Sequence, residues 1–286
     1  MPSVAERLAA ARRRLEAAGL DSTDAALDAE VLARHLLGWD RGTLLARSRE
    51  PEPLHFPDAF DSLIARRVQR EPVAQIVGVR EFWERDFEVT PDVLIPRPET
   101  EIIVEEAVAF CRTRRCRNII DVGTGSGCLA VTIACELLDV KVTATDLSEA
   151  ALAVARRNAH RYGVADRLTF VNTDVLLDVR GTAELILSNP PYVPDADAAT
   201  LQPEVVRYEP HAALFGGKDG LDVIGRLFTQ AHTHLADDGL LIVEFGFGQA
   251  AGVASLARKT GWRVERIRED LQGIPRTILL RRSSNG

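Results

Sequence analysis

Short β-prone runs alternate with amphipathic helical stretches over most of the chain, from residue 118 to residue 281. Such alternation is typical of a parallel sheet, because neighbouring parallel strands need a helical crossover between them. We therefore predict an α/β fold built on a doubly wound parallel sheet, with strands at residues 118–122, 141–146, 168–172, 184–188, 239–245, 263–266 and 277–281. The predicted helices of this region cover residues 128–138, 148–162, 221–235 and 250–260.

The N-terminal part of the chain shows helical periodicity instead. Apolar residues recur at helical spacing in residues 5–19, 24–37 and 57–70. Asp21-Ser22-Thr23 supplies capping groups for the second of these helices. Its inward side chains are expected to be Ala26, Leu27, Val31, Leu32 and Leu36. We predict that residues 1–75 form a small helical bundle that docks a protein partner.

Two β-prone runs follow, residues 73–78 and residues 82–89, with a turn between them. We predict that they form a β-hairpin linker, residues 76–95, between the helical bundle and the sheet. After the linker, Ile95-Pro96-Arg97-Pro98 is a stiff entry into the next helix. The predicted sheet domain covers residues 96–286.

Composition and charge restrict the possible functions. The 286 residues are 46% hydrophobic, and no apolar run reaches the roughly 18 residues of a membrane helix. The N-terminus becomes charged at once, so we expect no signal peptide, a cytoplasmic location and no membrane contact. The net charge of −7 argues against an extended nucleic-acid-binding surface. We expect a monomer without a metal site, and reduced thiols at Cys111, Cys116, Cys128 and Cys135.

A glycine-rich turn follows the first strand of the predicted sheet and opens a helix. Its residues are Gly123, Thr124, Gly125, Ser126 and Gly127. Glycine permits positive φ and close backbone approach, and a helix N-terminus offers unpaired N–H groups, so the turn predicts a nucleotide-like ligand. Cys128 stands where the dinucleotide fingerprint has a glycine, and the Gly-Lys-Ser/Thr of a phosphate-binding loop is missing. The Asp-x-Gly-x-Gly-x-Gly form resembles the S-adenosyl-L-methionine loop of class I methyltransferases.

Acidic residues follow the next two strands. Asp146 lies about twenty residues beyond the glycine turn, where a carboxylate accepts hydrogen bonds from both ribose hydroxyls of a nucleotide cofactor. The alternative is a helix-entry role before Ser148, which resembles an N-cap. Asp174 and Val175 follow the third strand and offer a carboxylate for an adenine amino group and an apolar contact for its ring.

The fourth strand ends in Asn189-Pro190-Pro191-Tyr192. Prolines cannot donate to a sheet and they fix φ, so the strand stops and the Asn189 amide and Pro190 carbonyl are held in a fixed geometry. These acceptors suit the two hydrogens of a planar NH2 group, with Tyr192 packed on or beside it. The alternative is a turn without a chemical role. We assign catalysis to Asn189, Pro190 and Tyr192, substrate contacts to all four residues, and a cofactor contact to Asn189.

Further motifs resemble one enzyme family. They are Pro72-Val73-Ala74-Gln75-Ile76-Val77-Gly78, Glu81-Phe82-Trp83, Leu94-Ile95-Pro96-Arg97-Pro98-Glu99-Thr100-Glu101, Tyr208-Glu209-Pro210 and Gly216-Gly217-Lys218-Asp219-Gly220-Leu221. With the glycine turn and Asn-Pro-Pro-Tyr, they resemble the protein-(glutamine-N5) methyltransferases of bacterial peptide chain release factors. The resemblance implies a Rossmann-like, seven-stranded class I methyltransferase domain with S-adenosyl-L-methionine as cofactor. It also implies methylation of the glutamine in the Gly-Gly-Gln loop of class 1 release factors, which the N-terminal bundle docks.

Two other functions remain open. An adenine-N6 methyltransferase acting on DNA or RNA would use the same Asn-Pro-Pro-Tyr to hold a flipped base, although the acidic balance argues against it. A non-catalytic methyltransferase-like binding protein would be expected to lack Asn189 or the glycines, which this chain retains. The long segment at residues 193–220 is predicted to shape or cover the substrate entrance.

Overall fold

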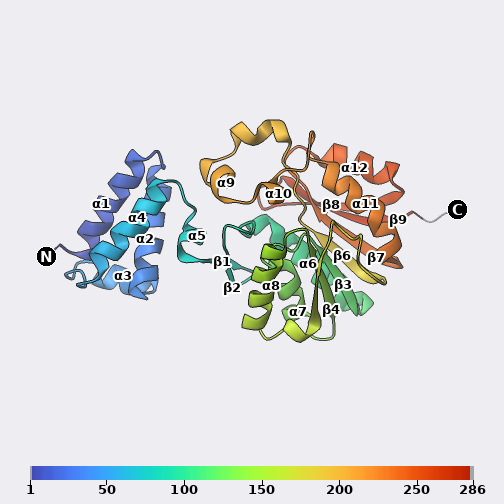
Figure 1. Cartoon of the computed structure of the whole chain (residues 1–286), viewed down its shortest axis with the longest axis horizontal. Helices are drawn as coiled ribbons and strands as arrows, with labels where there is room; N and C mark the ends of the chain where they lie inside the picture. The colour runs from blue at the N-terminus through green and yellow to red at the C-terminus, as the bar shows by residue number, and fades with distance from the viewer. Residues whose placement is uncertain (1, 284–286) are drawn as a thin grey trace. The chain divides into compact units, whose positions relative to one another are not determined.

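The computed structural model describes residues 2–283 (Figure 1). Contacts along the chain divide it into two compact units. The helical unit extends to Val79 and also includes the later segment Gln202–Tyr208. The sheet unit contains Arg80–Leu201 and the chain from Glu209 onward.

The N-terminal helices of the helical unit confirm the predicted bundle. They are α1 (Val4–Ala17), α2 (Ser22–Leu37), α3 (Arg41–Arg47), α4 (Phe56–Val68) and α5 (Val73–Val77). Ser3 and Glu6 form a capping box at the start of α1, and Asp21 caps α2 by accepting from backbone N–H groups. These caps satisfy N–H groups that a helix start otherwise leaves without partners.

The core of the helical unit consists of apolar side chains from α1, α2 and α4, among them Leu15, Phe60 and Ile64. The expected inward position of Leu27 was wrong, because its side chain is 51% exposed. The buried face of α2 is formed instead by Ala25, Ala29, Leu32 and Ala33. The small alanine side chains on this face let α2 pack closely against its neighbours. The hydrophobic pattern of the sequence did not show that the alanines, rather than Leu27, face the core.

Helix α9 (Pro203–Tyr208) belongs to the helical unit although it lies far along the chain. Arg67 donates to Asp28 Oδ2 at 2.6 Å and to Glu204 Oε1 at 2.9 Å. Arg70 donates to Glu204 Oε2 at 2.9 Å. Because the Arg67 and Glu204 side chains are only 8% and 12% exposed, this ion-pair cluster fixes α9 to the bundle.

The predicted strand at residues 73–78 is instead the short helix α5. Pro72 precedes the helix with φ −60° and Gly78 follows it with φ 77°, so proline and glycine set a helical start and stop that override the β-branched residues. The hairpin lies later in the chain, in β1 (Val79–Phe82) and β2 (Arg85–Glu88). Both residues of its turn have positive φ, as in a type I′ turn.

The sheet of the sheet unit confirms the predicted strand positions. Its parallel strands are β3 (Asn118–Val122), β4 (Lys141–Asp146), β5 (Leu168–Asn172), β6 (Ala183–Ser188) and β7 (Leu235–Glu244). It also contains β8 (Trp262–Glu269) and β9 (Pro275–Arg282). Within residues 2–283 the seven strands are ordered β5-β4-β3-β6-β7-β9-β8.

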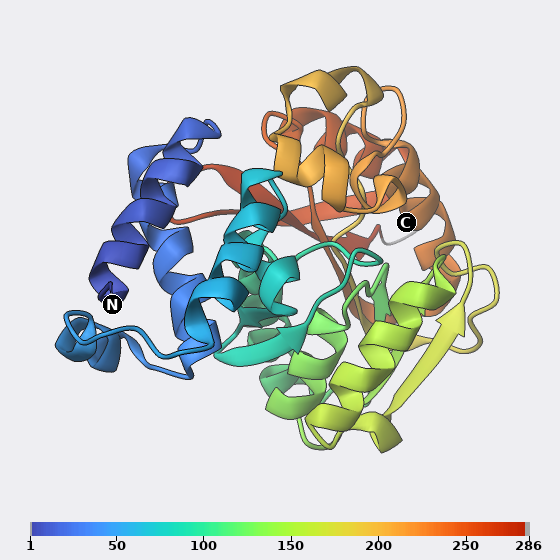
Figure 2. The same ribbon diagram turned by 60° about the vertical axis from the view of Figure 1, so that its left-hand side comes forward.

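One edge of the sheet departs from the parallel arrangement of the other strands. Strand β9 runs antiparallel to both β7 and β8. Residues 270–274 form the whole connection between β8 and β9, and this is too short for the crossover that parallel strands require. The opposite edge is β5, which lies beside α8 (Glu149–Arg161), as Figure 2 shows.

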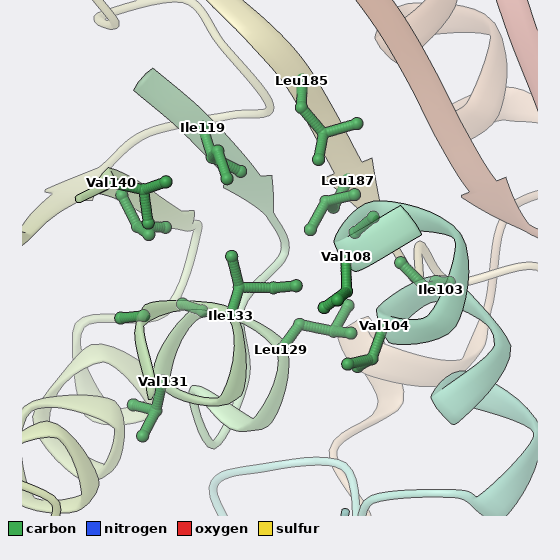
Figure 3. Packing of buried hydrophobic residues seen from close by; sticks show 14 of the residues in the cluster. Ile103, Val104, Val108, Ile119, Leu129, Val131, Ile133, Val140, Leu185 and Leu187 are labelled. Carbon is green, nitrogen blue, oxygen red and sulfur yellow. The ribbon is translucent and has the colours of Figure 1, made fainter. Parts of the chain in front are cut away.

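Helices cover both faces of the sheet. One face packs against α8, α6 (Glu101–Arg114) and α7 (Cys128–Glu136), and the other against α11 (Asp222–His234) and α12 (Ala250–Lys259). Successive strand residues alternate between the faces, so Ile119 packs in the first cluster and Ile120 in the second. Figure 3 shows Ile119, Leu185 and Leu187 facing side chains of α6 and α7. Short helical turns complete the unit: η1 (Pro98–Thr100), η2 (Ala165–Arg167), η3 (Asp195–Thr200) and α10 (His211–Leu214).

The structure corrects the prediction that all four cysteines are reduced. Cys111 in the last turn of α6 forms a disulfide with Cys116, which precedes β3. Arg115 ends α6 in a left-handed conformation with φ 53°, and this turn brings the two Cα atoms to 4.9 Å. Cys128 and Cys135 are free thiols.

Candidate functional site

A cavity of about 280 Å³ opens at the carboxyl ends of the parallel strands. The residues that line it follow β3, β4, β5 and β6, and further walls come from residues 92–94, from the segment around α10 and from α11. Strand β3 lies between β4 and β6, so the chain leaves it in one direction and returns on its other side. Ligands of open α/β sheets bind at such a switch point.

Most residues singled out in the sequence lie at this cavity. Those that line it are Gly123, Gly125, Asp146, Asp174, Val175, Asn189, Pro190 and Pro191. Four others do not line it: Thr124, Ser126 and Tyr192 each adjoin a lining residue, and Gly127 lies two positions beyond Gly125. Arg226 also lines the cavity, although no sequence motif singled it out.

The glycine turn folds around the Asp146 carboxylate. Gly125, at φ 54°, donates its N–H to Asp146 Oδ2 at 2.9 Å, and Ser148 donates its N–H to Oδ1 at 2.9 Å. Burial raises the pKa of Asp146, while the bonds from Ser148 and Gly125 lower it. Each carboxylate oxygen keeps a second acceptor site for a ligand hydroxyl. A Cβ on Gly127 would lie 3.0 Å from Ala155 Cβ, so glycine is needed where the turn meets α8.

Thr124 and Asp121 stabilise the glycine turn through buried hydrogen bonds. Thr124 Oγ1 donates to Asp121 Oδ2 at 2.6 Å, and the N–H of Ala130 donates to the same oxygen at 3.2 Å. Burial raises the pKa of Asp121 to about 7, although these two bonds lower it. Asp121 Oδ1 has no hydrogen-bond partner among residues 2–283. The side chain of Thr124 therefore stabilises the glycine turn through a carboxyl group to which sequence reasoning had given no role.

A strained corner follows β5. Val175 has φ 59°, a left-handed conformation that costs a residue other than glycine about 1–3 kcal/mol. Thr145 Oγ1 holds the corner by donating to Val175 O at 2.9 Å. Asp174 Oδ1 lies 3.4 Å from Arg226 Nη2, so a cation and a carboxylate sit together in the cavity wall.

A buried hydrogen-bond network orients Asn189, which follows β6. Asn189 Nδ2 donates to Thr100 Oγ1 at 2.9 Å, and Thr100 donates to Glu244 Oε2 at 2.7 Å. The Tyr192 hydroxyl donates to Glu244 Oε1 at 3.2 Å, so it is directed into this network. Burial raises the pKa of Glu244 to about 7, although the bonds from Thr100 and Tyr192 lower it. The Asn189 side chain, which lines the cavity, therefore has Oδ1 left for a ligand.

Two of the sequence motifs meet at Glu209. Its carboxylate is buried and accepts from the Ile95 N–H at 3.0 Å and from the Arg97 guanidinium. The stretch just before Ile95 and the stretch just after Glu209 both line the cavity. Glu209 therefore ties together two cavity walls that are distant in sequence.

Known proteins show which family shares these features. A family model described as "PrmC N-terminal domain" matches residues 6–78, and one described as "Methyltransferase small domain" matches residues 101–209. The release factor glutamine methyltransferase of Cereibacter sphaeroides is 43% identical over 277 residues, which are 97% of this chain and 98% of the relative. The chain belongs to the release factor glutamine methyltransferases. Another member, from Nitratidesulfovibrio vulgaris, is 42% identical and aligns with 96% of this chain and 93% of its own. The family resemblance seen in the sequence is thus confirmed.

Solved structures share the fold of this chain. A methyltransferase from Pyrococcus furiosus superposes with a TM-score of 0.52 at 23% identity, covering 76% of this chain and 95% of that one. The ribosomal protein L11 methylase from Lactobacillus delbrueckii subsp. bulgaricus gives 0.50 at 20% identity, covering 65% and 80%. They confirm the predicted class I methyltransferase fold. No helix within residues 2–283 is long and apolar enough to cross a membrane. Over the same range, no group of His, Cys, Asp and Glu side chains is arranged to hold a metal ion.

Proposed function

We propose that this chain transfers a methyl group from S-adenosyl-L-methionine to the side-chain amide nitrogen (N5) of a glutamine, the one in the Gly-Gly-Gln loop of class 1 peptide chain release factors. The names of relatives that match it over nearly their full length support this substrate. The observation that carries the chemistry is the Asn189 side chain, which is held by Thr100 with one acceptor oxygen left for a ligand at the switch point of the sheet.

The cavity residues fit S-adenosyl-L-methionine. Asp146 has acceptor sites for ribose hydroxyls, and Asp174 and Val175 offer a carboxylate and an apolar contact for the adenine. A Cβ at Gly123 or Gly125 would meet nothing within 4 Å, so the space beside the turn is open to a ligand. We assign Thr124, Ser126 and Gly127 to shaping this turn. The bound cofactor supplies a methyl group that its positively charged sulfur activates for transfer.

Asn189 and Pro190 are proposed to hold the glutamine carboxamide. Asn189 Oδ1 and the Pro190 carbonyl accept its two N–H groups, with Pro191 and Tyr192 completing the binding segment. An amide nitrogen is a weak nucleophile because its lone pair is delocalised, and these two bonds favour a more pyramidal nitrogen whose lone pair faces the methyl carbon. S-adenosyl-L-methionine bound in the cavity would supply the methyl group to this nitrogen, which would give up one of its two protons as the new N–C bond replaces the S–C bond of the cofactor. Such alignment is worth about 7–11 kcal/mol of barrier lowering.

The helical unit is proposed to dock the release factor. Residues 1–75 would supply the docking surface, and a linker at residues 76–95 would join it to the catalytic residues 96–286. The match of residues 6–78 to a family-specific N-terminal domain supports this assignment. We propose that residues 193–220 shape the substrate entrance, since this segment contributes α9 to the helical unit and also residues of the cavity wall.

The proposal is tested by transfer of labelled methyl from S-adenosyl-L-methionine to purified release factor. A release factor whose Gly-Gly-Gln glutamine is replaced by alanine is the control, and DNA and ribosomal RNA are alternative acceptors. We expect label on the intact release factor alone. Label on nucleic acid would support the adenine-N6 alternative. Binding of the cofactor without transfer to any acceptor would support a non-catalytic binding protein.

A further inference from the structure

The side-chain amide of Asn189 has two nearly equivalent orientations, and only one of them suits the proposed substrate. With Oδ1 toward the cavity, Asn189 accepts an N–H of a carboxamide. With Nδ2 toward the cavity, two donors would face each other and no bond would form. Proline fixes the backbone after Asn189 but leaves rotation of this amide free. A neighbouring group must therefore select the orientation.

Thr100 makes that selection possible through the polarity of its hydroxyl. A hydroxyl has one hydrogen and two lone pairs, and an ionised carboxylate only accepts. Thr100 Oγ1 lies 2.7 Å from Glu244 Oε2, so its hydrogen is committed to the carboxylate. Its remaining lone pair, 2.9 Å from the Asn189 amide, then requires a donor. Only Nδ2 of that amide donates.

We infer that Thr100 and Glu244 are positioning residues which hold the Asn189 amide with Oδ1 toward the substrate. The inference rests on the proposed glutamine methylation. Both residues are almost fully buried, at 2% and 1% exposure, so water does not substitute for either bond. The Tyr192 hydroxyl donates to the second oxygen of Glu244 and occupies the acceptor site that would otherwise admit another donor.

The orientation depends on the charge of Glu244. Protonated Glu244 can donate to Thr100, whose hydrogen then turns toward Asn189 and favours the reversed amide. The charged or titratable groups around Glu244 act in opposite directions: Glu99 raises its pKa and Arg276 lowers it. Burial raises the pKa of the Cys128 thiol, and the charges of Asp121 and Glu244 raise it further. Burial is the largest effect and raises the pKa of Glu244 to about 7. The change in the orientation of the Asn189 amide is therefore expected near neutral pH.

The test compares Thr100→Val, which removes the hydroxyl at nearly constant volume, with Thr100→Ser, which keeps it. The matched control is Thr132→Val, because Thr132 is equally buried and its hydroxyl has no partner among residues 2–283. Methyl transfer to release factor, cofactor affinity and thermal unfolding are measured for each variant. We expect Thr100→Val to lower kcat by about 10- to 100-fold with little change in cofactor affinity. Thr100→Ser should stay within about threefold of wild type, and Thr132→Val should match it.

The pH profile separates positioning from simple structural support. Wild-type kcat should fall as the pH drops through about 7, where Glu244 becomes protonated. The kcat of Thr100→Val should not show this fall, because valine has no hydroxyl through which the protonation of Glu244 could change the orientation of Asn189. Equal kcat in Thr100→Val and wild type, or equal losses in the Val and Ser variants, would overturn the inference. Absence of methyl transfer in the wild type would instead refute the proposed function itself.

Discussion

Replacing Glu204 by glutamine tests whether the ion-pair cluster fixes α9 to the helical unit. Glu204 binds Arg67 and Arg70 through its two oxygens, with a side-chain exposure of only 12%. A hydrogen bond to a charged group contributes about 1.5–3 kcal/mol. Arg67 keeps its bond to Asp28 and glutamine keeps one acceptor oxygen, so we expect the loss of about one such bond, about 1.5–3 kcal/mol. This corresponds to about 10- to 100-fold more frequent detachment of α9.

Hydrogen exchange of peptides that cover residues 202–208 measures this detachment. Glu149→Gln is the control, since Glu149 forms an exposed ion pair with Arg156. Burial raises the pKa of Glu204, but the bonds from Arg70 and Arg67 outweigh it and the net pKa is lowered. The ionised Glu204 therefore stabilises the cluster above pH 4.5, and this contribution is lost on further acidification in wild type but not in Glu204→Gln. Unchanged exchange in Glu204→Gln, or the same change in Glu149→Gln, would refute the role of the cluster.

Three further predictions concern the sheet unit. Asp146→Asn should weaken S-adenosyl-L-methionine binding by about tenfold or more in calorimetry, because asparagine replaces one of the two acceptor oxygens by an NH2 donor, and an unchanged Kd would contradict this role. Glu209→Gln should lower the free energy of unfolding by about 1–3 kcal/mol, since the buried carboxylate holds the Ile95 N–H and the partly exposed Arg97, and an unchanged denaturant midpoint would count against it. Burial raises the pKa of Glu244 from 4.5 to about 7, so folded protein holds a proton that unfolded protein releases, and wild-type stability should fall as pH rises across this window. Glu244→Gln should flatten that fall, and identical pH–stability curves would disprove it.

The hydrophobic pattern predicted the sheet well because each strand is short, apolar and followed by a turn. Strands β3, β4 and β5 begin and end where the sequence predicted. The hydrophobic pattern did not predict the structure where helix-capping residues or the length of a connection determine it. Proline and glycine made a helix of residues 73–77, and the short connection before Pro275 made β9 antiparallel.

Only those site residues that belong to a local sequence motif could be predicted. The glycine turn, Asp146 and Asn189 each lie at the end of a strand, and the order of the strands brings them to one edge. Thr100 and Glu244 could not be found in this way, because a bond between residues 89 positions apart, such as that of Thr100 with Asn189, leaves no periodic signal. The same holds for Glu204, whose partners lie more than 130 positions earlier.

Asn189→Ala gives the most direct measurement of the central claim, that Asn189 and Pro190 hold the glutamine amide for transfer. Single-turnover methylation of release factor and calorimetric binding of S-adenosyl-L-methionine are measured on the same preparation. We predict that the variant loses methyl transfer while its cofactor affinity stays nearly that of wild type. Normal transfer by Asn189→Ala, or weakened cofactor binding with transfer retained, would contradict the claim.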